Sequence, residues 1–155
     1  MSRNGKANFK QLKKLQKEMQ RFKRDELDAF AESAAKELAA RLLAKVIKRT
    51  PVGQYPDVPG KVGGTLRRGW TGGKKASGKS YAESLKIHTF GDTYVVEIIN
   101  PTEYASYVEF GHRTRNHKGW VRGRFMMTIS ASEIEREAPA ILERKLKKKL
   151  GELFD

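Results

Sequence analysis

The sequence predicts an α+β fold: a long N-terminal helix, a central antiparallel β-hairpin or sheet with a short helix, and an amphipathic C-terminal helix. Three observations support this. Apolar residues recur at helical spacing at both ends of the chain, β-branched residues dominate a short central run, and proline and glycine are concentrated between these regions. With 155 residues and 38% apolar content, the chain suits a single domain spanning 1–155.

The N-terminal helix is predicted from Phe9 to about Arg49, because apolar residues recur there at spacings of three and four. Thr50-Pro51 ends it, since a residue before proline is disfavoured in the α region. Such a helix would be about 60 Å long at ~1.5 Å per residue, longer than a domain of this size covers. We therefore expect a break near Asp25, a helix over 25–50 in the body, and a basic arm over 1–24 that becomes ordered on assembly.

Residues 51–80 are predicted to form a long loop, since they contain three of the five prolines and eight of the fourteen glycines. Within it, Gly73 to Ser80 matches the phosphate-binding P-loop pattern. That chemistry needs a buried strand before the loop and a helix after it. The residues before the loop are not strand-like, and those after it suggest a short strand. We therefore predict no nucleotide site.

Residues 81–155 are predicted to hold the sheet and the last helix. Leu85 and Ile87 alternate with polar residues up to Phe90, Gly91-Asp92 supplies a turn, and Tyr94 to Ile99 is a β-branched run. This pattern predicts a β-hairpin.

A short helix is predicted from Glu103 to Phe110, with Gly111 as its C′ residue, followed by a basic loop from His112 to Gly119. Ser130 and Glu133 have the spacing of a capping box, which predicts that the last helix begins there. Pro139 lies inside this helix and should kink it.

The net charge of +14 is distributed in blocks. Val58 to Ala82 and Phe110 to Ser132 contain no acid, whereas residues 83–109 contain five acids and one base. Alternating blocks suit docking against an oppositely patterned neighbour or a polyanion. The plain alternative is that the basic loops only keep the protein soluble.

Several functional classes are disfavoured by the sequence. The chain has no cysteine, which excludes disulfides and thiolate sites, and no apolar run approaches the ~20 residues of a membrane span. No signal-peptide pattern follows the basic N-terminus, so a soluble protein made inside the cell is expected. His112 and His117 lie among cations, and no catalytic pairing is visible. We expect no enzyme activity, cofactor, metal or membrane partner.

Two groups of residues are candidate contact sites. Aromatic and arginine residues alternate after residue 103, as in interface hot spots or in surfaces that stack on single-stranded nucleic acid. Capping of the core is the alternative for Tyr104 and Phe125. The predicted interface comprises Tyr104, Tyr107, Glu109, Phe110, His112, Arg113, Arg115, Trp120, Arg122 and Arg124. The predicted loop-docking or DNA-contacting group comprises Arg67, Arg68, Trp70, Lys74, Lys75 and Lys79.

Three motifs together resemble a known family. Thr50-Pro51-Val52 ends the long helix and is followed by Gly64-Thr65-Leu66-Arg67-Arg68-Gly69-Trp70. Later come Asn100-Pro101-Thr102-Glu103-Tyr104-Ala105-Ser106-Tyr107-Val108-Glu109-Phe110-Gly111-His112-Arg113 and Gly119-Trp120-Val121-Arg122-Gly123-Arg124-Phe125-Met126-Met127. In order and spacing these resemble the lambdoid-phage tail-component family of neck, or tail-completion, proteins. The loop from Val52 to Gly64 is longer than in that family, and Phe110 replaces a common tyrosine.

The resemblance implies a structural virion protein that forms a homo-oligomeric ring, six-fold or twelve-fold, joining the head connector to the tail. The implied partners are other copies of the chain, the head-side connector, the tail terminator and, non-specifically, the packaged DNA. The implied location is the neck of a phage or phage-tail-like particle, and the host cytoplasm during assembly. A basic nucleic-acid-binding module is the alternative, and the steep salt dependence of DNA binding would distinguish it.

Overall fold

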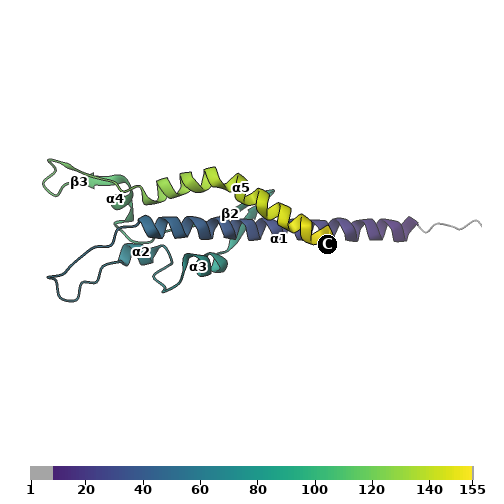
Figure 1. The fold of residues 1–155 in the computed structure, drawn as a ribbon, viewed down its shortest axis with the longest axis horizontal. Helices are drawn as coiled ribbons and strands as arrows, with labels where there is room; N and C mark the ends of the chain where they lie inside the picture. Colours follow the sequence, from purple (N-terminus) through teal and green to yellow (C-terminus); the bar gives the residue numbers. More distant parts are fainter. Residues whose placement is uncertain (1–8, 155) are drawn as a thin grey trace, which may run out of the picture.

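The computed structural model describes residues 9–154 and confirms the α+β class (Figure 1). Two long helices lie side by side. Shorter helices and one hairpin lie around the C-terminal half of the first, and a second hairpin extends beyond its C-terminal end. The elements in chain order are α1 (Phe9–Arg49), α2 (Thr65–Gly69), α3 (Gly78–Ser84), β1 (Ile87–Phe90), β2 (Thr93–Val96), α4 (Ala105–Phe110), β3 (Gly111–Arg113), β4 (Trp120–Arg122) and α5 (Met126–Phe154).

Helix α1 ends at Arg49, as Thr50-Pro51 predicts. The predicted break near Asp25 is wrong, because the helix continues through this residue without interruption. The N-terminal part of α1 extends beyond the rest of the fold in Figure 1. Residues 9–24 of the predicted basic arm are therefore helical, and residues 1–8 lie outside the described part. That the arm becomes ordered on assembly stays a prediction.

The core surrounds the C-terminal half of α1. Helix α3 packs closely on α1 because Gly78 has no side chain: a Cβ there would lie 3.1 Å from the Cβ of Leu43. Strand β2 lies against another side of α1, where the Tyr94 hydroxyl donates a hydrogen bond to Asp28. The buried apolar cluster comprises Ala39, Leu43, Val46, Leu66, Trp70, Ala82 and Met126.

Each of the two sheets is a two-stranded antiparallel hairpin. The predicted central hairpin forms from β1 and β2, with Ile87 opposite Val96, and its second strand is shorter than expected. The second hairpin, of β3 and β4, places Gly111 opposite Arg122. It was not predicted, because the sequence suggested only a basic loop there.

The predicted loop over 51–80 contains two helices, so the prediction was wrong for its second half. Helix α2 begins at Thr65. Helix α3 begins at Gly78, within the P-loop-like segment, and continues to Ser84 where a strand was expected. Ser77 caps α3 by accepting a hydrogen bond from the Ser80 amide at 3.1 Å. The segment therefore connects two short helices, and α2, not a strand, precedes it.

Helix α5 begins at Met126, so the capping box predicted at Ser130 is wrong. Ser130 lies within the helix, where its hydroxyl donates to the Met126 carbonyl at 2.6 Å. The helix continues through Pro139 to Phe154. Its first turn carries no acid of its own, and Glu109 of α4 caps it instead.

Candidate functional site

A buried connection between the end of α1 and α2 uses three of the motif residues. The Thr50 hydroxyl donates to the Val46 carbonyl at 2.6 Å and accepts from the Trp70 indole nitrogen Nε1 at 2.8 Å. The Thr50 carbonyl accepts two hydrogen bonds from the Arg67 guanidinium, at 3.1 and 2.7 Å. Thr50 is fully buried and Trp70 is 5% exposed. Trp70 and Arg67, predicted as docking residues, thus hold the fold together.

Glu109 is also internal, with 6% exposure. Its carboxylate accepts hydrogen bonds from the Met127 and Thr128 amides at 2.9 and 2.8 Å, and from the Thr128 hydroxyl at 2.7 Å. These amides belong to the first turn of α5, where backbone donors lack helical partners and a negative charge is favoured. Glu109 therefore caps α5 from α4.

The second hairpin leaves and rejoins the fold at one place. Gly111 has φ of 88°, and a Cβ on it would lie 2.4 Å from the Val121 carbonyl oxygen, so only glycine fits. On the return, the amides of Arg124 and Phe125 donate to the carbonyls of Val108 and Glu109 at 2.8 and 3.0 Å. The β3–β4 excursion is thus closed at its base by backbone hydrogen bonds.

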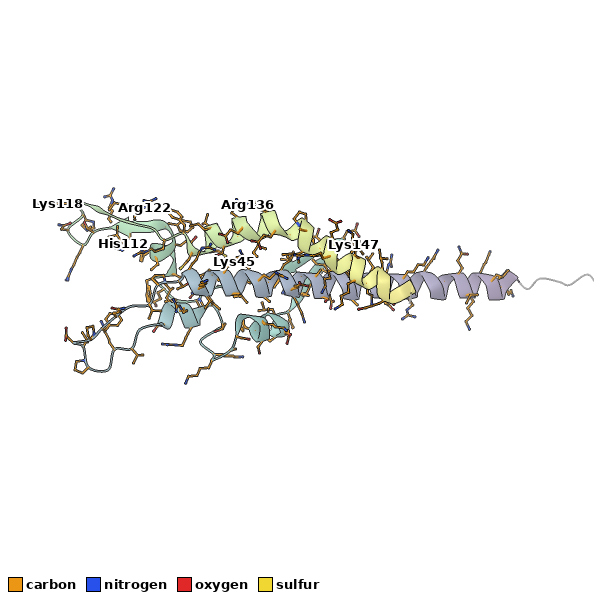
Figure 2. All side chains as sticks on the ribbon, viewed as in Figure 1. Lys45, His112, Lys118, Arg122, Arg136 and Lys147 are labelled. Atoms are coloured by element: carbon orange, nitrogen blue, oxygen red, sulfur yellow. The ribbon has the colours of Figure 1, made fainter. Side chains whose placement is uncertain are left out.

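Around this hairpin lies an exposed surface rich in aromatic and cationic side chains, which we call the hairpin surface. Trp120 is 63% exposed, and Tyr107 packs edge-on against His112 with ring centroids 5.9 Å apart. Figure 2 shows His112, Lys118 and Arg122 together at this end of the molecule. The hairpin surface comprises Tyr107, Phe110, His112, Arg113, Arg115, Lys118, Trp120, Val121, Arg122 and Arg124.

Eight of the ten residues predicted for the interface lie in the second hairpin or directly beside it. Glu109 is buried, and Tyr104 lines a pocket with Thr65 and Arg68 at α2. Large exposed apolar side chains beside arginines are typical of protein contact sites. The other predicted group does not join them, because α2 and α3 lie across α1 from α5 in Figure 1. In that group Arg68, Lys74, Lys75 and Lys79 are exposed.

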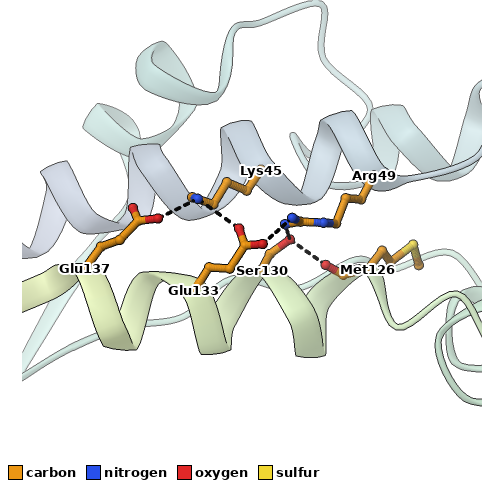
Figure 3. Close-up of polar contacts among 6 residues, drawn as sticks. All are labelled: Lys45, Arg49, Met126, Ser130, Glu133 and Glu137. Atoms are coloured by element: carbon orange, nitrogen blue, oxygen red, sulfur yellow. Dashed lines mark hydrogen bonds and ion pairs between the residues drawn. The ribbon is translucent and has the colours of Figure 1, made fainter.

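Ion pairs hold α5 against α1 (Figure 3). Lys45 Nζ lies 2.8 Å from a carboxylate oxygen of Glu133 and 2.8 Å from one of Glu137, and Arg49 also pairs with Glu133. Hydrogen bonds from Lys45 and then Arg49 lower the pKa of Glu133 to about 2, and those from Glu133 and Glu137 raise the pKa of Lys45. These ion pairs hold α5, which follows the second hairpin in the chain, against α1.

Two further kinds of site, a metal site and a membrane span, find no candidate among the described residues. Among the side chains that the structure describes, no three His, Asp or Glu residues come together as metal ligation would require. No helix in this part of the chain combines the length and apolar character that crossing a bilayer demands.

Comparison with known proteins gives one match. A family model described as "Bacteriophage HK97-gp10, putative tail-component" matches residues 13–111, which is more than half of the chain. No curated protein and no solved structure matches the chain. The match extends through α1 to α4 and includes Thr50, Trp70 and Glu109. It ends at Gly111, where the hairpin begins.

Proposed function

The chain belongs to the HK97-gp10-like family of bacteriophage tail components, and we propose that it is a subunit of a ring in the phage neck. In this proposal the ring joins the head connector to the tail and has six-fold or twelve-fold symmetry. Its partners are further copies of the chain, the head-side connector and the tail terminator. The protein is then located in the virion, and in the host cytoplasm before assembly.

The hairpin surface is the observation that supports this proposal. Its apolar members are exposed in the single chain, although burying such side chains is the main source of affinity in protein contacts. A ring needs a heterologous interface, in which one patch meets a different patch on the next copy. The hairpin is suited to provide the first patch, since it is anchored at its base and extends from the body (Figure 1).

Charge supports an acidic surface as the second patch. Glu83, Asp92, Glu97 and Glu103 are exposed, and no ion pair among the described side chains involves them or the hairpin arginines. Opposite charges left unpaired within one copy are available to pair between copies, where they set orientation and the rate of association. We therefore pair the hairpin surface of one subunit with these acids of the next. The exposed cations Arg68, Lys74, Lys75 and Lys79 are a second candidate contact.

The test is charge reversal on the hairpin. We expect Arg113→Glu with Arg115→Glu to raise the concentration needed for ring assembly about tenfold or more, because like charges would then face each other. Sedimentation velocity of the full chain measures assembly, and electron microscopy of particles measures incorporation. A matched control, Arg136→Glu with Lys147→Glu, makes the same charge change on exposed positions of α5 (Figure 2) and should assemble normally.

Assembly of the hairpin variant at the wild-type concentration would show that the hairpin surface is not the ring interface. Equal loss in the control variant would mean that net charge, and not this pairing, controls assembly. A wild-type chain that stays monomeric and never enters particles would overturn the proposed function itself.

A further inference from the structure

We propose that the projecting part of α1 is a contact surface for the phosphate backbone of duplex DNA, in addition to the ring function. The relevant cations are Lys10, Lys13, Lys14, Lys17, Arg21 and Arg24. Their separations of three, one, three, four and three residues place all six within about 100° of one side of an α-helix. We call this set the basic stripe.

The basic stripe has a large excess of positive charge. All six side chains are exposed, and none of the ion pairs among the described side chains involves them. Glu18, the one acid between Lys10 and Arg24, lies at the edge of the stripe, four residues after Lys14 and three before Arg21, so cations outnumber acids there six to one. Six like charges close together repel one another, so a polyanion that neutralises them is the partner they favour.

The other side of the same helix has the opposite character. Leu12 and Leu15 lie away from the basic stripe and are 57% and 53% exposed. A helix that is apolar on one side and cationic on the other can rest its apolar side on protein while its cations face a polyanion. The cations are therefore on the side where a protein neighbour is least favoured.

The dimensions of the stripe suit duplex DNA. From Lys10 to Arg24 the helix rises about 21 Å at ~1.5 Å per residue. Duplex DNA carries one negative charge per about 1.7 Å of its axis, so about twelve phosphates lie along this length. The contact would be independent of base sequence, because lysine and arginine here meet phosphate oxygens and no base-reading motif is present in the sequence.

The arm is also clear of the folded body. The most N-terminal residue of α1 in a described tertiary hydrogen bond is Asp28, which accepts from Tyr94. A free helix of this kind can lie along a groove or a row of phosphates without rearrangement of the core. Removal of its charges should consequently leave the stability of the domain unchanged.

The experiment measures binding of the full chain to a fluorescein-labelled duplex of mixed sequence, about 30 base pairs long, by anisotropy over a range of NaCl concentrations. Each neutralised phosphate contributes about −0.9 to the slope of log K against log salt. For Lys13→Gln, Lys17→Gln and Arg21→Gln combined, we expect a slope shallower by up to about 2.7 and affinity at least about tenfold lower at low salt. Thermal unfolding should be unchanged.

The matched control removes three exposed cations from α5, Arg136→Gln, Arg144→Gln and Lys148→Gln, and should keep the wild-type slope. Equal losses in the two variants, or a wild-type chain that does not bind the duplex, would overturn the inference. So would an arm variant that binds DNA normally but no longer assembles, since the basic stripe would then dock on acidic residues of a second copy. Normal assembly of the arm variant together with weaker DNA binding is the expected result, and it keeps this test separate from that of the ring.

Discussion

The two tryptophans of the chain each lie near arginine, but one is buried in the core and the other is exposed in the second hairpin. Trp70 is 5% exposed and donates its indole N–H to Thr50, beside Arg67, which holds the Thr50 carbonyl. Trp120 is 63% exposed and lies among arginines that no described ion pair involves. The same residue types therefore have two roles. Trp70 and Arg67 donate hydrogen bonds to the buried hydroxyl and carbonyl of Thr50. Trp120 and its neighbouring arginines are exposed and available to contact a partner.

The largest expected effect comes from exchanging each tryptophan for alanine. Trp70→Ala should lower the free energy of unfolding by about 3–5 kcal/mol, because it opens a cavity beside Leu66 and Met126 in the core. Trp120→Ala should change it by no more than about 0.5 kcal/mol, as for other exposed sites, while it weakens ring assembly. Urea unfolding and sedimentation velocity measure the two effects. Similar destabilisation in both variants would show that Trp120, like Trp70, serves the stability of the fold and not partner binding.

A smaller effect is expected at Glu109, which belongs to the buried region although its neighbours belong to the hairpin surface. Glu109→Ala removes the acceptor for two amides and a hydroxyl at the start of α5, and should destabilise the fold by about 2 kcal/mol. Glu103→Ala, at an exposed position nearby, is the control and should be nearly neutral. Urea unfolding measures the free energy of unfolding of both variants. An unchanged value for Glu109→Ala would contradict the capping role and favour the predicted role of Glu109 in the interface.

The smallest effect concerns pH and the ion pairs between α1 and α5. Because the pKa of Glu133 falls to about 2 in the folded chain from 4.5, its ionised form stabilises the fold above about pH 4.5. This contribution should diminish as the pH falls from about 4.5 to about 2. Glu133→Gln should remove that part of the pH dependence of thermal unfolding.

Glu143→Gln is the control for this pH effect, since Glu143 pairs only with exposed Lys147 one turn away. It should keep the wild-type pH profile. A Glu133→Gln variant with an unaltered profile would mean that the ion pairs do not fasten α5 to α1.

The long elements could be predicted from the sequence because their signals are local. The apolar spacing and Thr50-Pro51 define α1 and its end, and Gly91-Asp92 defines the first turn. The start of α5 could not be found this way. Its cap, Glu109, comes from another helix, so the local Ser130 pattern was misleading.

The residue types of the candidate site could be predicted from the sequence, but which of these side chains are buried could not. Exposed aromatics and arginines near the second hairpin were identified, although β3 and β4, with three residues each, are too short to show alternation. Trp70, Arg67 and Glu109 were assigned to contacts because nothing in the sequence shows that Thr50 and the first turn of α5 require partners. Tertiary hydrogen bonds of this kind are decided by the fold.

The closed base of the second hairpin has an evolutionary consequence. Since the chain departs at Gly111 and returns to the Val108 and Glu109 carbonyls, the residues between can lengthen, shorten or change without disturbing α4 or α5. Mutations in this segment would change which partner the hairpin binds and leave folding of the domain unaffected. A particle could in this way acquire a new binding specificity by drift in one short excursion while the scaffold beneath it stays the same.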